Sequence, residues 1–278
     1  GRFYAADINP SHVITARRVV EEAGLDNVTH LEASFEEMLE IDLPQFDYIV
    51  FHGVWTWVSP RARRDIRRFV RARLKTGGAV YVSYNTAIGW ERRHTLGRVF
   101  KELVGASHGP LSQRIEIAIG IMRGLVEQGE GYFAENEVAK GWVESVAKSS
   151  HRYLAHEYLN EHWDLFYHPD VAAEMAKAKL NYVGSTDVLR NFDRYVLKEN
   201  SAKAADSLGN PALTELLKDL DTNWGLRRDV YMRGSAQWPQ QEAFELFSKL
   251  EIALIQSRGK IENECKTPIG ESTIEPKL

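Results

Sequence analysis

The sequence of 278 residues has a single cysteine, Cys265, and no long apolar run. One cysteine excludes an internal disulfide framework and argues against a thiolate zinc site, so we expect a reducing cytoplasm. No segment approaches the roughly 20 consecutive apolar residues of a membrane-spanning helix, so we predict no membrane span. The net charge of −4 gives no reason to expect a nucleic-acid partner.

A glycine-rich loop is also absent ahead of the first predicted strand, at residues 3–6. Asp7 follows this strand, and a turn leads from it to a helix near Ser11. In nucleotide-binding α/β folds an acidic residue at this place binds a ribose, about 20 residues after a glycine-rich loop. Because such residues also cap helices, ribose binding and helix capping are both open roles for Asp7.

Strands and helices alternate over the first 90 residues. Further strands are predicted at 27–34, 46–54 and 79–86, and a helix is predicted to begin at Ser59 and Pro60 and to end at the segment 76–78. This order favours an α/β fold with a parallel, doubly wound sheet.

The helix after Ser59 is rich in basic residues, opposed only by Asp65. We interpret residues 61–75 as a solvated outer face, with a docking patch for an acidic partner as the alternative. The basic side chains are Arg61, Arg63, Arg64, Arg67, Arg68, Arg71, Arg73 and Lys75.

The spacing of apolar residues divides the rest of the chain into three segments. Residues 91–164 are predicted to be a helical insertion, and 165–235 to return to the sheet with a closing antiparallel pair at 180–183 and 228–233. We therefore expect domains at 1–90, 91–164, 165–235 and 236–278. The last of these is predicted to hold a helix over 239–255 and then a polar tail. Within 165–235 the pair Asn210-Pro211 marks a helix start.

A cluster of histidine and acidic residues precedes Asp164 but does not have metal-ligand spacing. His151, His156 and His162 are five and six residues apart, whereas a helical two-histidine site needs three or four. We predict no metal site.

Three segments together resemble a known family: "FYAADINPSHVITARRVVEEAGLDNVTHLEASFEEM", "FDYIVFHGVWTWVSPRARRDI" and "LKTGGAVYVSYNT". They are similar to class I S-adenosylmethionine-dependent methyltransferases from the second strand onward. The block "YLAHEYLNEHWDLFYHPDVAAEMAKAKLNYVGS" resembles the methyltransferase regulatory domain, which also occurs in bacterial protein-lysine methyltransferases. The resemblance covers residues 1–235 and implies a Rossmann-like methyltransferase sheet, incomplete at its N-terminal side, with a large helical insertion.

The resemblance implies S-adenosyl-L-methionine as cofactor, bound where ligands bind in open α/β sheets, at the carboxyl ends of the strands. Asp7 would accept hydrogen bonds from the ribose hydroxyls. Ser34 stands where the family often has an aspartate that binds the adenine amino group. The other implied cofactor contacts are Ile8, Phe35, His52 and Gly53.

Methyl transfer is an in-line displacement, so the enzyme mainly has to align its reactants and exclude water. We predict Tyr84 and Asn85, at the end of the fourth strand, as catalytic candidates, and Trp55 and Trp57 as the substrate rim. The alternative is that the two tryptophans only cover the core and that Asn85 is a turn residue. The expected acceptor is a protein side chain such as lysine, or a small molecule.

Three interpretations of the chain remain open. We favour a fragment that lacks the leading strand, because that strand is normally the centre of such a sheet. The alternatives are a degenerate methyltransferase-like interaction module and an NAD-dependent oxidoreductase. We also expect a homodimer, since the helical region contains the apolar run "IEIAIGIMRGLV".

Overall fold

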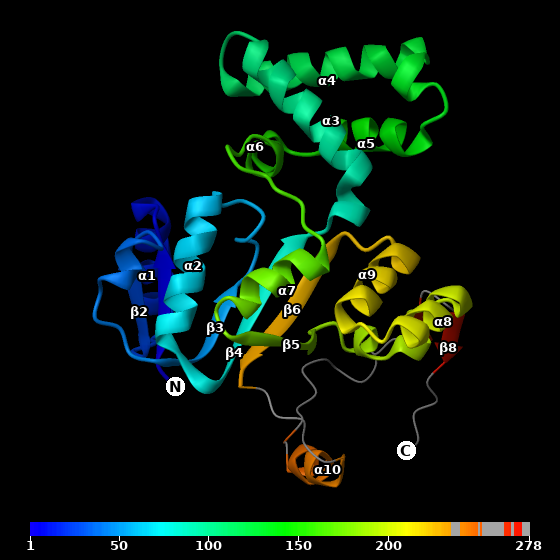
Figure 1. Cartoon of the computed structure of the whole chain (residues 1–278). Coiled ribbons are helices and arrows are strands. Elements are labelled where there is room, and N and C mark those ends of the chain that lie inside the picture. The colour runs from blue at the N-terminus through cyan, green and yellow to red at the C-terminus, as the bar shows by residue number, and fades with distance from the viewer. Residues whose placement is uncertain (235–239, 250, 252–263, 268–269, 274–278) are drawn as a thin grey trace.

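A four-stranded sheet forms the centre of the molecule (Figure 1). The computed structural model describes residues 1–234, 240–249, 251, 264–267 and 270–273. In the order of the sheet, the strands are β3 (Phe46–Phe51), β4 (Leu74–Asn85), β6 (Leu226–Arg233) and β5 (Leu180–Ser185). Strands β3 and β4 are parallel, and β6 is antiparallel to β4 and to β5. The predicted antiparallel closing pair is confirmed.

The first two strands form a separate sheet. β1 (Phe3–Asp7) and β2 (Val28–Glu32) are parallel and are joined by α1 (Pro10–Glu22). Among the described residues no hydrogen-bonded ladder joins β1 to β3. The Tyr4 ring packs edge-on against the Phe46 ring instead, with centroids 5.4 Å apart. The single sheet that the sequence predicted is thus divided in two along this line.

The basic helix α2 (Pro60–Arg73) begins where predicted. The Ser59 hydroxyl accepts a hydrogen bond from the Ala62 amide at 3.1 Å, and Pro60 needs no amide partner at the first position. Its apolar stripe faces the core. The predicted end at 76–78 is wrong, because Leu74 is extended, fully buried and already paired with Phe46 of β3.

Four helices make up the helical region. They are α3 (Ala87–Ala106), α4 (Leu111–Gln128), α5 (Glu137–Lys148) and α6 (His151–Tyr158), with the short 3₁₀ helix η2 (Gly131–Phe133) between α4 and α5. They enclose a hydrophobic cluster of their own that includes Phe100, Ile115, Met122 and Leu154. The predicted insertion is confirmed, although its first helix begins at Ala87 rather than Glu91.

The helical region leaves and rejoins the sheet at one point. Thr86 and Phe166 form a parallel bridge. The Phe166 amide donates to the Asn85 carbonyl at 3.1 Å, and the Ala87 amide donates to the Phe166 carbonyl at 2.9 Å. In Figure 1 the whole region stands above this point.

The chain after Phe166 packs back onto the sheet. α7 (His168–Ala176) covers the same face as α2 (Figure 1). After β5 come the 3₁₀ helices η3 (Val188–Asn191) and η4 (Asp193–Tyr195), α8 (Glu199–Leu208) and α9 (Pro211–Thr222). The Asn210 side chain caps α9, as the Asn-Pro pair predicts.

The C-terminal part differs from the prediction. α10 (Gln240–Ser248) covers the first part of the helix predicted at 239–255, and residues 252–255 lie outside the described residues. β7 (Glu264–Thr267) and β8 (Gly270–Thr273) form an antiparallel hairpin where we expected a polar tail. The backbone pairing of this hairpin needs no apolar periodicity, so the pattern did not reveal it. Within the described ranges, no helix is long and apolar enough to cross a membrane.

Candidate functional site

Asp7 lies at the carboxyl end of β1 with its side chain 44% exposed. Its Oδ1 accepts a hydrogen bond from the Asn9 amide at 2.8 Å, and its Oδ2 lies 3.0 Å from His12 Nδ1. The residue that caps α1 is Asn9, whose side chain accepts from the Ser11 amide. The capping role considered for Asp7 therefore belongs to Asn9, and the Asp7 carboxylate remains accessible at the strand end.

Ser34 follows β2 and is part of a reciprocal capping arrangement. Its amide donates to Glu37 Oε2 at 2.7 Å, and the Glu37 amide donates to the Ser34 hydroxyl at 3.2 Å. The hydrogen bond from the Ser34 amide lowers the pKa of Glu37 below its usual value. The Ser34 hydroxyl contributes a smaller effect in the same direction. A carboxylate thus lies beside the neutral Ser34, at the start of the 3₁₀ helix η1 (Glu37–Leu39). Sequence reasoning missed Glu37, although the Ser-x-x-Glu spacing signals it.

His52 and Gly53 follow β3. His52 Nδ1 lies 2.9 Å from the Tyr81 hydroxyl, and the Gly53 amide donates to the Ser83 hydroxyl at 2.7 Å. Gly53 has a φ of 64°, a left-handed conformation that glycine adopts without strain. A Cβ here would have no heavy atom within 4 Å, so open space adjoins this backbone.

The structure brings these three strand ends to one edge. Asp7 pairs with Glu32 in the β1–β2 register, and its carbonyl accepts from the Ala33 amide at 3.2 Å. The Phe35 ring packs edge-on against Phe51, with centroids 6.2 Å apart, which links the end of β2 to the end of β3. Ile8 is exposed beside Asp7.

The other predicted site residues lie deeper. Tyr84 and Asn85 are buried. The Tyr84 hydroxyl donates to Asp229 Oδ2 at 2.7 Å, and burial together with the Asp229 charge raises the pKa of Tyr84 well above its usual range. Trp55 is fully buried, and the Trp57 ring stacks on Trp163 with centroids 5.8 Å apart. A catalytic or substrate role for these four residues stays a prediction.

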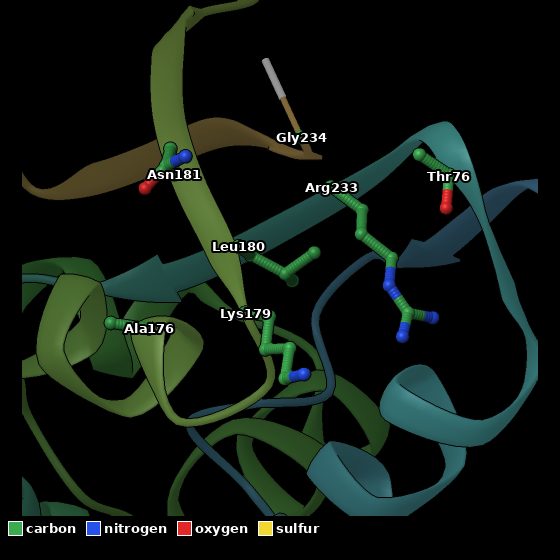
Figure 2. A pocket seen from close by; sticks show the side chains of 7 residues that line it. All are labelled: Thr76, Ala176, Lys179, Leu180, Asn181, Arg233 and Gly234. Atoms are coloured by element: carbon green, nitrogen blue, oxygen red, sulfur yellow. The ribbon is translucent and has the colours of Figure 1, made fainter.

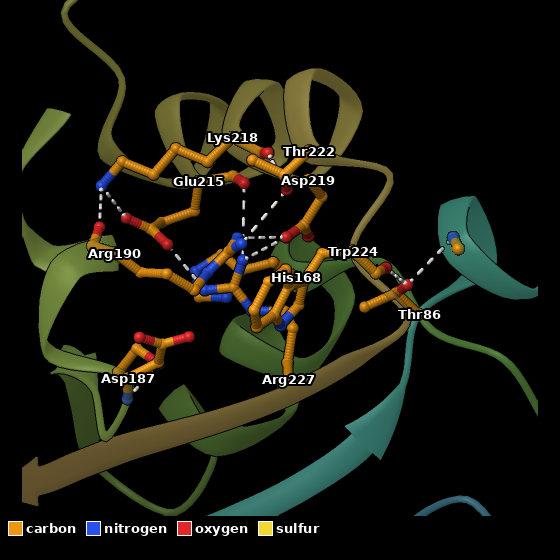
Figure 3. A network of polar contacts seen from close by, with 12 residues as sticks. Thr86, His168, Asp187, Arg190, Glu215, Lys218, Asp219, Thr222, Trp224 and Arg227 are labelled. Atoms are coloured by element: carbon orange, nitrogen blue, oxygen red, sulfur yellow. Dashed lines mark hydrogen bonds and ion pairs between the residues drawn. The ribbon is translucent and has the colours of Figure 1, made fainter. Parts of the chain in front are cut away.

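A network of buried charges surrounds Arg227 (Figure 3), and Tyr84 joins it through its hydrogen bond to Asp229. Arg227 donates to Glu215 at 2.6 Å, to Asp219 at 2.9 Å and to Asp229 at 3.0 Å. Arg190 adds a second cation, 2.7 Å from Asp219. Further contacts come from Lys218 to Glu215 and from His168 to Asp229. Sequence reasoning missed this network.

A cavity of about 410 Å³ lies at the opposite end of the central sheet (Figure 2). It is lined by the amino end of β5, including Leu180, and by Thr76 near the start of β4. Arg233 borders it and donates to the Leu74 carbonyl at 2.6 Å. Because ligands of open α/β sheets bind at the carboxyl ends of strands, we do not assign this cavity to the candidate site. No group of histidine, cysteine and acidic residues in the described part of the chain has metal-binding geometry.

Residues 150–233 match the model of a family described as a predicted methyltransferase regulatory domain. The Synechocystis protein sll1526 is 36% identical over 277 residues, which are all of this chain and 55% of that protein. The Rickettsia prowazekii protein RP789 is 28% identical over 80% of this chain and 40% of its own length. The chain thus spans about half the length of these relatives.

Two structures of PKMT2 from Rickettsia typhi have a similar fold. The structure in complex with AdoHcy has a TM-score of 0.69 at 23% identity, covering 88% of this chain and 46% of that chain. The other structure has a TM-score of 0.68 at 23% identity, and the match covers 94% of this chain and 50% of that chain. The molecule therefore has a Rossmann-like α/β fold similar to that of PKMT2.

The resemblance predicted from the sequence is confirmed at two levels: the fold is similar to that of PKMT2, and residues 150–233 match the model of the predicted methyltransferase regulatory domain. The match begins inside the predicted helical range 91–164, so the division of the chain into four domains stays a prediction.

Proposed function

We propose that this chain is part of an S-adenosylmethionine-dependent methyltransferase that acts on a protein side chain such as lysine. The supporting observation is the accessible Asp7 carboxylate at an edge where three strand ends meet. The similarity to PKMT2, which was solved in complex with AdoHcy, favours methyl transfer over the hydride transfer of an NAD-dependent oxidoreductase.

The residues at this edge fit the cofactor. The Asp7 carboxylate would accept hydrogen bonds from the ribose hydroxyls. Its Oδ2 would give up the contact with His12 to do so. The exposed Ile8 offers an apolar face to the adenine, and Glu37, beside Ser34, offers an acceptor for the adenine amino group. At Gly53 the open space allows the backbone to approach the methionine end closely.

When bound, the cofactor supplies an activated methyl group. The chain then has to align an acceptor nitrogen with that group and keep water away. A lysine amine must be neutral to react, which burial near the site would favour. We retain Trp57 and Asn85 as proposed acceptor-side residues, since both lie close in sequence to the strand ends. Tyr84 would act only through the Asp229 network.

Two matched variants test the cofactor site. Asp7→Ala should weaken binding of AdoHcy, measured by calorimetry, by about one to three orders of magnitude, because charge-assisted hydrogen bonds to the ribose are lost. Its melting midpoint should barely change. Asn9→Ala should do the reverse: it removes the cap of α1, costs about 1 kcal/mol of stability and leaves affinity unaltered. An unchanged dissociation constant in Asp7→Ala would remove the main support for this site, and NADH binding in place of AdoHcy would favour the oxidoreductase.

We further propose that a second copy of the chain pairs along α4. Ile117, Ile121 and Leu125 are exposed and spaced four residues apart, so they form one apolar stripe. Ile121→Glu should convert a dimer to a monomer in light scattering. A wild-type protein that stays monomeric at high concentration would refute the proposal. A cytoplasmic location stays a prediction that rests on the single cysteine.

A further inference from the structure

Trp163 lies where the helical region meets the loop that follows β3. It belongs to the segment 159–167, which leads from α6 down to α7 (Figure 1), and to the residues that match the regulatory-domain model. The loop, residues 52–57, carries the proposed cofactor contacts His52 and Gly53 and the proposed acceptor-side residue Trp57. Trp163 is therefore far from this loop in the sequence and next to it in the fold.

Two contacts join the segment 159–167 to the end of the loop. The Trp57 ring stacks on the Trp163 ring, with centroids 5.8 Å apart and 23° between their planes. The Asp164 amide donates to the Thr56 carbonyl at 3.0 Å. The Thr56 hydroxyl in turn accepts from the Asn85 amide at 2.8 Å, at the end of β4. The end of the loop is thus held by β4 and also by the segment that carries Trp163.

The Trp163 ring is itself fixed by the helical region. Trp90 and His94 of α3 and Tyr158 of α6 contact it edge-on, with ring centroids 5.7, 4.7 and 5.5 Å away. His94 Nε2 also lies 3.2 Å from the Trp163 carbonyl oxygen. One indole ring therefore contacts both helices and the loop at the strand end.

Gly97 of α3 allows this close packing. The residue is buried, and a Cβ there would lie 2.6 Å from Cη2 of Trp163 and 2.9 Å from Cδ1 of Tyr158. Atoms at such distances repel one another, so a larger residue at position 97 would displace the Trp163 ring. Glycine is unfavourable in a helix interior, and the close approach of Trp163 accounts for its presence here.

We propose that Trp163 is a positioning residue that couples the helical region to the proposed cofactor site. Its ring, held by α3 and α6, fixes Trp57 and with it the end of the loop that carries His52 and Gly53. A change in the helical region then reaches the site without any contact to the cofactor. This inference rests on the proposed function, because the loop affects activity only if the cofactor binds beside it.

The first test follows the Trp57 ring. The chain labelled with 5-fluorotryptophan gives one ¹⁹F signal for each of its seven tryptophans, and a Trp57→Phe variant assigns the signal of Trp57. Gly97→Ala should shift the Trp57 signal, although the atoms nearest to the added Cβ belong to Trp163 and Tyr158. Gly105→Ala, in the same helix and with no heavy atom within 4 Å of its Cβ, should leave the signal unchanged.

The second test measures AdoHcy affinity by calorimetry. Gly97→Ala and Trp163→Leu should each weaken binding by about two- to thirtyfold, the range for residues that couple to a site without touching its ligand. Trp163→Phe should bind nearly as wild type. It keeps a flat ring and loses only Nε1, which has no hydrogen-bond partner in the described part of the protein. A merely structural role would lower the melting midpoint and leave the dissociation constant of the folded protein unchanged.

The outcomes separate this inference from the proposed function. A Trp57 signal that stays fixed in Gly97→Ala refutes the link between the helical region and the loop. A shifted signal with unchanged AdoHcy affinity refutes the coupling to the site. A wild-type chain that does not bind AdoHcy refutes the proposed function and leaves Trp163 as a structural contact only. If Gly97→Ala does not fold, Trp163→Leu serves for both tests.

Discussion

Replacing Asp229 with asparagine tests the buried charge network directly. Asp229 is 0% exposed, and its carboxylate accepts from Arg227 Nε at 3.0 Å, from the Tyr84 hydroxyl at 2.7 Å and from His168 Nδ1 at 3.0 Å. Asparagine keeps the size, removes the charge and turns an NH₂ group toward donors. Since breaking a buried pair costs about 3 to 5 kcal/mol, we expect Asp229→Asn to lose about that much.

The loss is large compared with the roughly 5 to 15 kcal/mol that stabilises a typical domain. Urea unfolding followed by circular dichroism measures it at pH 7. The matched control is Asp47→Asn, which breaks an exposed pair with Lys75 at 2.9 Å and should cost less than about 1 kcal/mol. A loss as small as the control's in Asp229→Asn would refute the reasoning that this carboxylate holds the network together.

The difference in stability between wild type and Asp229→Asn should depend on pH in a defined way. Burial opposes ionisation of Asp229, but the hydrogen bond from His168 and the charge of Arg227 outweigh it and lower the pKa of Asp229. Its stabilising contribution is therefore complete above the unfolded pKa of about 3.9 and is lost as pH falls through the lower folded pKa. The difference between wild type and Asp229→Asn should stay constant from about pH 7 to 5 and narrow below about pH 4. A gap that widened toward acid pH would contradict this sign.

Three further substitutions test local features. Ser59→Ala removes the cap of α2 and should cost about 1 kcal/mol in thermal unfolding; a cost near zero would mean that Pro60 alone fixes the helix start. Gly89→Ala should destabilise by about 1 to 3 kcal/mol in urea, because its Cβ would collide with the backbone of Trp224 and Gly225. Gly105→Ala, with open space in the same helix, should instead gain up to about 1 kcal/mol, and equal effects at the two glycines would disprove the collision.

The sequence predicted the elements whose signals are local. Ser59 with Pro60 and Asn210 with Pro211 marked two helix starts, because capping depends only on neighbouring residues. The closing strands followed from β-forming composition. The strand ends around Asp7 could be placed together because parallel strands align their carboxyl ends.

The charge network could not be predicted in the same way. On α9, Glu215, Lys218 and Asp219 have the spacing of a solvated face. Their contacts with Arg227 of β6 and Arg190 of η3 show that they are buried. The burial of Tyr84 could not be predicted for a related reason. Its place at a strand end made it a catalytic candidate, but its hydroxyl donates to Asp229, which lies far away in the sequence.

The joining of Thr86 to Phe166 has a consequence for how such chains change over time. The helical region leaves and rejoins the sheet at adjacent backbone positions and has a core of its own. Replacing it with another region, or with a short loop, would therefore leave the register of β4 and the position of α7 unchanged. The same sheet can thus carry different inserted regions in different relatives. Differences in acceptor choice between relatives would then be sought in the exchanged helices before the strands of the proposed cofactor site.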